Sequence, residues 1–269
     1  MSIIKETKFI MHKYNIHPNK NLGQNFLINE EALNTIADNV TNQDTIIEIG
    51  PGLGTLTSIL LEKAKKVVVI ELDKKMIKIL EDRFMLYKNI EIINEDILKV
   101  NINEIAPKAK VVANLPYYIT TQIVTKIIQS NVKDITILIQ KEVAERMCAQ
   151  PGDKKAGAIT YYINYYADAT IVQNVPKESF LPSPKVDSAI VRIKKLDKPR
   201  VKVINEEILF KIIKGNFTKR RKNLLNSISN VIEKDKLKEI LKKLEIDENQ
   251  RGEELTLEQF AQITNLYCK

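Results

Sequence analysis

The sequence has no tryptophan, two histidines and two cysteines among 269 residues. Cys148 and Cys268 are too few for a disulfide framework, so we expect a protein of the reducing cytoplasm. With only His12 and His17, the chain lacks the residues for a zinc cluster or a serine-histidine pair. We therefore expect a site that holds no metal.

Long apolar runs are also missing. No stretch approaches the roughly 18 uninterrupted apolar residues of a membrane span. Residues 1–16 lack the apolar core and small-residue cleavage site of a signal peptide. We therefore expect no membrane partner.

The composition is that of a folded, basic protein. Apolar residues make up 44% and charged residues 28% of the chain, and its length suits one or two domains. Lys and Arg number 42 against 34 Asp and Glu, which gives a net charge of +8 and a pI of about 9.2. This balance favours a polyanionic partner, with nucleic acid ahead of an anionic membrane surface.

Short apolar runs alternate with helix-like runs through the first 200 residues, which predicts an α/β fold with a mostly parallel sheet and helices on both faces. After about residue 200 only helical spacing remains. Pro199 interrupts the pattern, so we expect one domain over 1–200 and a small all-α domain over 201–269. The expected strands are 45–49, 66–70, 90–93, 110–113, 134–139 and 187–193, and the expected helices are 55–66, 74–87, 119–130 and 141–149.

The first expected strand enters its helix through Glu48-Ile-Gly50-Pro-Gly52-Leu-Gly54. Glycine permits a sharp turn there and lets a ligand approach the backbone. Dinucleotide-binding loops space their glycines as G-x-G-x-x-G, whereas the spacing here is G-x-G-x-G. Glu48 would repel a pyrophosphate and tolerate an ammonium group. The pattern favours S-adenosylmethionine over a nicotinamide dinucleotide, with a purely structural turn as the alternative.

Acidic residues follow the next two strands. Glu71 ends the second strand, where a carboxylate can accept hydrogen bonds from both ribose hydroxyls of a nucleoside. Asp96 and Ile97 follow the third strand, where they could bind the adenine amino group and pack on its ring. Ordinary turn and capping chemistry is the alternative for each. The coincidence of these signals along one sheet edge strengthens the prediction of an S-adenosylmethionine site.

Asn114-Leu115-Pro116-Tyr117 follows the fourth strand at the same edge. The exocyclic amine of adenine is a poor nucleophile, and two acceptors, the Asn114 side chain and the Leu115 carbonyl, could draw it toward tetrahedral geometry. Pro116 fixes the backbone and has no N–H to compete. Tyr117 can stack on a base held out of its helix. The tetrapeptide indicates adenine methylation, and a turn with a core tyrosine is the alternative.

These motifs together resemble the S-adenosylmethionine-dependent rRNA adenine N6-dimethyltransferases. Three further strings share the resemblance: Gly23-Gln-Asn-Phe-Leu27, Gln140-Lys-Glu-Val143 and Phe180-Leu-Pro-Ser-Pro-Lys-Val-Asp-Ser-Ala189. The resemblance implies a Rossmann-like class I methyltransferase fold for residues 1–200, an RNA-binding domain over 201–269 and S-adenosylmethionine as methyl donor. The expected cofactor contacts are Asn25, Leu27, Gly50, Gly52, Glu71, Asp96, Ile97 and Asn114.

The resemblance also implies that Tyr117 and Phe180 flank the target adenine. An aromatic ring in a stiff loop with Pro182 and Pro184 is preorganised to stack on a flipped base, although it could instead anchor the loop by packing. Asn25 could equally be a helix cap, so its assignment depends on the resemblance alone.

Two branches of the family share these strings, one acting on small-subunit (16S) rRNA and one, the macrolide-resistance type, on large-subunit (23S) rRNA. Gly23, Leu115, the loop 151–157 and the segment 217–227 are more similar to the first branch, although Ala156 departs from its usual loop. We expect a monomer that dimethylates two adjacent adenosines in the 3′-terminal hairpin loop of small-subunit rRNA within a pre-30S particle. The alternatives are the large-subunit branch and a non-catalytic RNA-binding assembly factor on the same fold.

Basic residues lie in both expected domains. Residues 201–269 carry 14 basic and 11 acidic residues, and residues 1–200 carry 28 and 23. Each neutralised phosphate adds to RNA affinity, so we expect an RNA surface on both domains, with a solvated helix face as the alternative for the basic run at 219–222. The expected RNA contacts are Lys185, Lys219, Arg220, Arg221 and Lys222.

Overall fold

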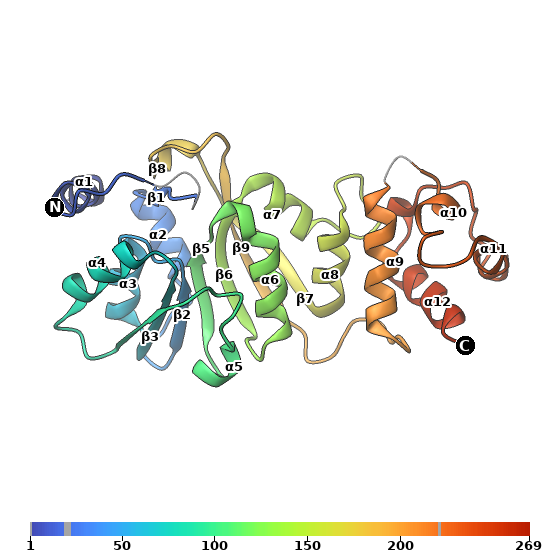
Figure 1. Cartoon of the computed structure of the whole chain (residues 1–269), viewed down its shortest axis with the longest axis horizontal. Coiled ribbons are helices and arrows are strands. Elements are labelled where there is room, and N and C mark those ends of the chain that lie inside the picture. The colour runs from blue at the N-terminus through green and yellow to red at the C-terminus, as the bar shows by residue number, and fades with distance from the viewer. Residues whose placement is uncertain (1, 19–22, 220–221) are drawn as a thin grey trace. The chain divides into compact units, whose positions relative to one another are not determined.

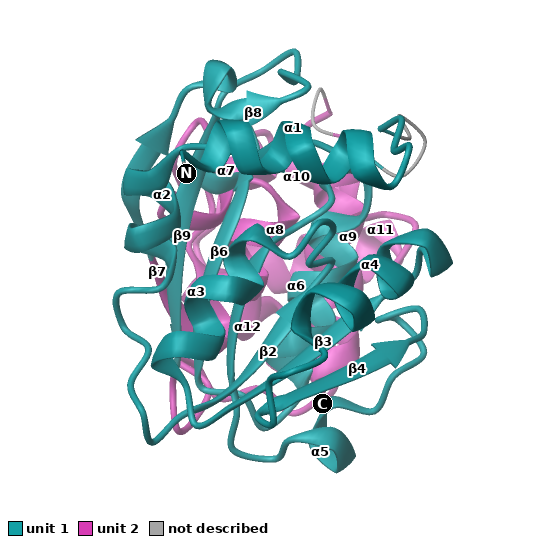
Figure 2. Cartoon of the chain, turned by 90° about the vertical axis from the view of Figure 1, so that its left-hand side faces the viewer, with its two compact units in different colours: residues 1–144, 170–195 teal, residues 145–169, 196–269 magenta. Residues whose placement is uncertain are grey.

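The computed structural model describes residues 2–18, 23–219 and 222–269 (Figure 1). Packing divides the chain into two compact units, coloured separately in Figure 2. The first unit comprises residues 1–144 and 170–195, and the second comprises residues 145–169 and 196–269.

A seven-stranded sheet forms the centre of the first unit, with the strand order β4-β3-β2-β5-β6-β9-β7. Strands β2 to β6 pair in parallel, and β9 runs antiparallel to β6. The Val- and Ile-rich runs of β3 and β6 are buried along nearly their whole length, as in sheets covered on both faces. The strands are β2 (Thr45–Ile49), β3 (Lys66–Glu71), β4 (Ile90–Asn94), β5 (Lys110–Asn114), β6 (Asp134–Gln140), β7 (Ala167–Val175) and β9 (Ser188–Lys195). The predicted mostly parallel α/β fold is confirmed.

The order of the parallel strands reverses at β2, since β3 and β4 lie on one side of it and β5 and β6 on the other. Because parallel crossovers are right-handed, α3 and α4 cover one face of the sheet and α6 covers the other (Figure 1). Such a reversal leaves a crevice at the carboxyl ends of β2 and β5, where open α/β sheets bind ligands. The helices of this unit are α1 (Ile3–Lys13), α2 (Glu30–Ile36), α3 (Thr55–Lys63), α4 (Lys74–Phe84), α5 (Ile102–Ile105), α6 (Thr120–Gln129) and α7 (Lys141–Cys148). Helix α7 begins in this unit and continues into the second.

Short elements cover the carboxyl edge of the sheet. Strand β1 (Phe26–Leu27) pairs antiparallel with β8 (Phe180–Leu181), and the single turns η2 (Tyr117–Ile119) and η3 (Lys177–Ser179) lie in the neighbouring loops. A small apolar cluster packs α1 against α4 and the glycine turn. Its buried members are Ile10, Ile16, Phe26, Leu53, Met76 and Ile79.

The second unit packs helices around two buried tyrosines. Tyr161 and Tyr165 lie on α8 (Ala158–Tyr166), and the Tyr161 hydroxyl donates to the Leu255 carbonyl at 2.6 Å. The other elements are α9 (Glu206–Thr218), α10 (Leu224–Ser227), α11 (Lys234–Lys243), η4 (Gly252–Glu254) and α12 (Leu257–Tyr267). In the described part of the chain, no helix has the length and apolar character needed to cross a membrane.

Helix α8 and strand β7 are not among the elements predicted from the sequence. Residues 158–166 are rich in aromatic and β-branched side chains, whose strand preference hides the helical spacing. Residues 145–169 pack with the helical unit, although they precede the domain boundary that we expect near residue 200. The division into 1–200 and 201–269 stays a prediction about domain roles. The expected helix over 74–87 ends earlier, at Phe84.

Candidate active site

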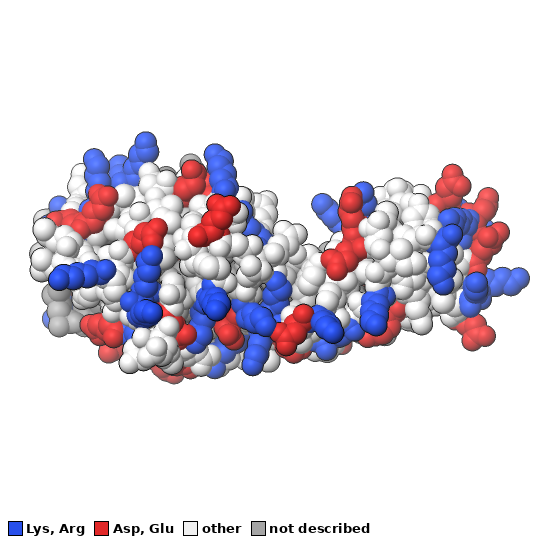
Figure 3. All heavy atoms as spheres, turned by 90° about the horizontal axis from the view of Figure 1, so that it is seen from below, with Lys and Arg blue, Asp and Glu red and all other residues white. Residues whose placement is uncertain are grey.

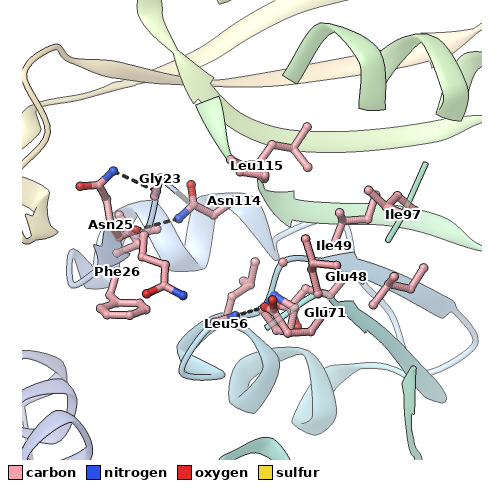
Figure 4. Close-up of a pocket in the computed structure, with 18 of the residues that line it drawn as sticks. Gly23, Asn25, Phe26, Glu48, Ile49, Leu56, Glu71, Ile97, Asn114 and Leu115 are labelled. Carbon is pink, nitrogen blue, oxygen red and sulfur yellow. Dashed lines mark hydrogen bonds between the residues drawn. The ribbon is translucent and has the colours of Figure 1, made fainter. Parts of the chain in front are cut away.

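A cavity opens at the carboxyl ends of β2, β3 and β5 in the first unit, with about 1060 Å³ of empty space including the part open to solvent. In Figure 4, Asn25 and Asn114 lie on one side of it and Glu48, Glu71 and Ile97 on the other. The sequence-predicted residues that line it are Asn25, Leu27, Gly50, Gly52, Glu71, Asp96, Ile97, Asn114, Leu115 and Tyr117. The structure therefore brings together residues from five separate segments of the chain.

The glycine turn needs its glycines for two reasons. Gly50, Gly52 and Gly54 have φ angles of 65°, 57° and 81°, in the left-handed region that favours glycine. A Cβ at Gly54 would lie 2.6 Å from the Phe84 ring, and one at Gly52 would lie 3.2 Å from the Phe26 ring. Gly54 therefore lets α3 pack closely on α4, while Gly52 keeps the backbone accessible at the cavity.

Glu71 at the end of β3 is 9% exposed, and its position is fixed by the backbone. Its carboxylate accepts the Gly52 N–H at 3.2 Å and the Asp73 N–H at 2.9 Å. Burial raises the pKa of Glu71, and these two N–H donors act against that shift. Asp73, rather than Glu71, caps α4, since it accepts the Lys75 N–H at 2.9 Å. The helix-cap interpretation of Glu71 is thereby excluded.

Glu48 is 2% exposed and accepts a hydrogen bond from the Thr57 hydroxyl at 2.6 Å. Burial raises its pKa to about 8. At pH 7 the free protein therefore holds this side chain mainly in its neutral form. The charge repulsion that the sequence analysis expects between Glu48 and a pyrophosphate does not operate in that form, whereas a bound cation would favour the carboxylate.

The end of β4 is tied to the end of β3 by a residue that the sequence analysis missed. The Asn94 amide donates to the Glu71 carbonyl at 2.9 Å and to the Leu72 carbonyl at 3.2 Å. Two residues further on, Asp96 accepts the Leu98 N–H at 2.9 Å in a turn, and Ile97 is 6% exposed at the cavity wall. Asn94 thus fixes the spacing between Glu71 and Asp96, the residues that the sequence predicts to bind the ribose and the adenine of a nucleoside.

Asn114 meets the N-terminal segment inside the cavity (Figure 4). Its amide nitrogen donates to the Asn25 carbonyl at 3.4 Å, and the Asn25 amide donates to the Gly23 carbonyl at 3.1 Å. The backbone N–H of Leu115 donates to Leu138 of β6 at 3.0 Å, which holds the tetrapeptide against the sheet. The Asn114 amide nitrogen and the tetrapeptide backbone are thus held in place at the cavity wall.

Two adjacent tyrosines stand at the cavity. The Tyr117 hydroxyl lies 2.6 Å from the Ser188 hydroxyl, and burial raises the pKa of Tyr117. Tyr118 lines the same cavity and is 54% exposed. Tyr118 is not among the cavity residues predicted from the sequence. Its position directly after the tetrapeptide could have indicated that it lines the cavity.

Phe180 is not brought to the cavity. Its ring is 3% exposed and belongs to the main apolar cluster of the first unit, with its residue paired to Leu27 across the β1-β8 ribbon. Burial of a phenylalanine ring stabilises this packing by about 2 kcal/mol. A stacking role for Phe180 stays a prediction, and it requires the ring to leave the core.

Of the expected RNA contacts, the described residues Lys185, Lys219 and Lys222 do not line the cavity. Lys185 is exposed in the loop after β8, and Lys219 and Lys222 are exposed after α9. Arg220 and Arg221 fall outside the described residues. On the face seen in Figure 3, Lys and Arg side chains are spread over both units and interspersed with Asp and Glu. Within the described residues, no group of three or more His, Cys, Asp or Glu is placed to hold a metal.

The open sheet, whose strand order reverses beside a glycine turn and whose next strand ends in a backbone-anchored glutamate, has the Rossmann-like fold of the class I S-adenosylmethionine-dependent methyltransferases. The family model described as ribosomal RNA adenine dimethylase matches residues 15–269, and this chain belongs to that family.

Relatives agree with this assignment. The chain is 44% identical to Ribosomal RNA small subunit methyltransferase A of Alkaliphilus oremlandii, over 98% of this chain and 97% of the relative. It is 45% identical to the protein of the same name from Clostridioides difficile, over 97% and 94%. A dimethyladenosine transferase from Plasmodium falciparum superposes with a TM-score of 0.75 at 28% identity, over 88% of this chain and 95% of that one. The 23S rRNA methyltransferase ErmE shares the fold, with a TM-score of 0.70 at 24% identity over 91% and 100%.

Proposed function

We propose that this chain transfers methyl groups from S-adenosylmethionine to N6 of two adjacent adenosines in the 3′-terminal hairpin loop of small-subunit (16S) rRNA, as a step of ribosome biogenesis. The observation that carries the proposal is the position of Asn114, Leu115 and Tyr117 on the wall of the cavity that also contains Glu71. The names of full-length relatives at 44–45% identity support the small subunit as the substrate.

The cavity fits a nucleoside cofactor at the turn between β2 and α3. A Cβ on Gly50 would lie 3.7 Å from Pro116 and would narrow the space between the turn and the tetrapeptide. Glu71 is held by two backbone N–H groups and would accept hydrogen bonds from the ribose hydroxyls. Asp96 and Ile97 would recognise the adenine. S-adenosylmethionine supplies a methyl group already activated on a sulfonium.

The residues of the tetrapeptide act on the adenine amine. The Asn114 oxygen and the Leu115 carbonyl accept its two hydrogens, and the ring face of Tyr117 stabilises the positive charge that the nitrogen gains. The surplus proton can leave to water. We therefore expect no metal and no general base with a shifted pKa to be needed.

We further propose that the partner is rRNA within a pre-30S particle and that the enzyme acts as a cytoplasmic monomer. Lys185, Lys219, Arg220, Arg221 and Lys222 would contact phosphates, because cations that neutralise phosphates supply most of the sequence-independent affinity for RNA.

The test uses labelled S-adenosylmethionine and each ribosomal subunit from a strain that lacks this activity, followed by mapping of the modified bases. We expect dimethyladenosine at two adjacent positions near the 3′ end of small-subunit rRNA. Label confined to large-subunit rRNA would establish the alternative branch. Binding of subunits without label in either RNA would establish a non-catalytic assembly factor.

A further inference from the structure

The tetrapeptide at the end of β5 is connected to β9 through the hydroxyl groups of Tyr117 and Ser188. Ser188 is the first residue of β9, and it is fully buried. It pairs with Gln140, the last residue of β6, while β6 lies between β5 and β9. The 2.6 Å contact between Tyr117 and Ser188 therefore spans the carboxyl end of β6.

Ser188 is itself held in place by the chain before it. The Asp187 carbonyl accepts the Lys141 N–H at 3.0 Å, and the Asp187 carboxylate accepts the Lys177 N–H at 3.0 Å. These bonds tie the start of β9 to the start of α7 and to the loop that leads into β8. The Ser188 hydroxyl therefore offers Tyr117 a hydrogen-bond partner whose position is fixed.

The backbone of Tyr117 is fixed from the other side. Pro116 has a φ of −64°, and the buried Thr120 hydroxyl donates to the Pro116 carbonyl at 3.0 Å. With the backbone held, the orientation of the Tyr117 ring depends on its two side-chain torsions. A hydrogen bond at the far end of the ring restricts the first torsion, which sets the direction in which the ring points from the backbone. Rotation about the second torsion leaves the hydroxyl oxygen in place, because that oxygen lies on the axis of rotation.

We infer that Ser188 is a positioning residue that orients the Tyr117 ring for the target base. The inference builds on the proposed function, because it concerns how one expected base contact is aligned. A ring free to swing would spend less time in the productive orientation, and misplacement of positioning groups lowers the rate of the chemical step. The ring-base contact itself would survive, so the loss is partial.

The experiment compares the wild type with Ser188→Ala, Tyr117→Phe and the double variant. It measures the single-turnover rate of methyl transfer at saturating S-adenosylmethionine and saturating ribosomal subunit, taking whichever subunit the wild type labels. Each single variant should lower the rate about two- to tenfold, the range of one net hydrogen bond. The double variant should be no slower than either single variant, because both remove the same contact.

Two further measurements separate positioning from structural support. Affinity for S-adenosylmethionine, measured by calorimetry, should stay within about twofold of the wild type in all variants. Ser130→Ala is the matched control, since Ser130 is also buried and donates to the Ile127 carbonyl at 2.6 Å, before the opposite end of β6. It should lower the melting temperature without lowering the transfer rate.

A wild-type rate in Ser188→Ala would overturn the inference, as would a further rate loss on adding Ser188→Ala to Tyr117→Phe. A rate loss in Ser130→Ala that matched the loss in Ser188→Ala would also overturn it, because the effect would then be general destabilisation. Label in the large subunit instead would refute only the proposed substrate, and the same variants would still be compared on that subunit.

Discussion

The two compact units bury polar side chains for different purposes. In the second unit, the buried Ser227 hydroxyl donates to the Asn216 side chain at 2.8 Å, so the polar groups satisfy one another inside the packing. In the first unit, Glu48 and Glu71 are also buried but line a cavity. Burial of a polar side chain therefore does not by itself mark a candidate site, whereas burial beside open space does.

Glycine shows the same contrast. A Cβ on Gly252 in the second unit would lie 1.9 Å from the Asn216 side-chain oxygen, so this glycine exists to permit packing. A Cβ on Gly52 would meet the Phe26 ring at 3.2 Å, and Gly52 also lines the cavity. Substitution of Gly252 should therefore change stability alone, and substitution of Gly52 should also change binding.

The largest effect should come from Asn114→Ala. It removes the acceptor that we propose for the reacting amine, so turnover should fall by about a thousandfold, the upper range for one preorganised hydrogen-bonding group. Affinity for S-adenosylmethionine should stay within about tenfold, because the loss falls mainly on the transition state. Rates of methyl transfer and calorimetric titrations measure the two quantities. An active Asn114→Ala enzyme would contradict the assignment.

The second effect concerns pH. The pKa of Glu48 is about 8 in the folded protein and has its ordinary, lower value in the unfolded chain. The folded state therefore holds a proton that the unfolded state releases, and this contribution to stability is lost as pH rises through 8. Glu48→Gln keeps an acceptor for Thr57 and removes the titration. The variant should match the wild type near pH 5 and exceed it near pH 9 by on the order of 3 kcal/mol.

Chemical denaturation at a series of pH values checks this prediction. Parallel stability curves for the wild type and Glu48→Gln would show that Glu48 does not titrate between pH 5 and 9.

Glu71→Ala should weaken S-adenosylmethionine binding by about 1.5 to 3 kcal/mol, the range for a hydrogen bond to a charged group. The matched control is Glu206→Ala, because Glu206 accepts from Tyr165 at 2.9 Å and from Tyr166 at 2.7 Å in the second unit. That variant should lose stability and keep its cofactor affinity. Equal cofactor affinity in the wild type and Glu71→Ala would show that Glu71 does not contribute to cofactor binding.

Gly252→Ala tests the glycine comparison directly. The added methyl group overlaps Asn216, so we expect a loss of about 2 kcal/mol, which lowers the melting temperature by about 4 to 8 °C in a chain of this size. Cofactor affinity should not change. Gly52→Ala should cost less stability, about 1 kcal/mol of backbone strain, and should weaken cofactor binding by more than that amount. Calorimetry of both proteins provides both readouts, and weakened cofactor binding in Gly252→Ala would undo the comparison.

The sequence sufficed wherever function follows strand order. Glu71 and Asn114 end strands of a parallel sheet and Asp96 follows one, and such strand ends meet at one edge, so local patterns predicted their common cavity. Phe180 could not be placed this way, because a proline-rich loop does not reveal whether its aromatic ring faces solvent or core. The raised pKa of Glu48 depends on burial by neighbours distant in the sequence. The packing of 145–169 with the helices depends on such contacts as well.

The smallest effect should come from the basic run in the second unit. Lys219 and Lys222 are exposed, and together with Arg220 and Arg221 they would contribute up to four phosphate contacts. Replacing all four with Gln should weaken binding to RNA or subunits and leave cofactor affinity unchanged, because the described residues that line the cavity all belong to the first unit.

Each phosphate contact that is lost should reduce the slope of log affinity against log salt by about 0.7 to 0.9. Lys185→Gln in the first unit is the companion variant, with an expected change of one such step. Filter binding or fluorescence titration at several salt concentrations gives the slopes. If the fourfold variant kept the wild-type slope while Lys185→Gln lowered it, RNA would be bound through the first unit, and the run at 219–222 would be a solvated surface.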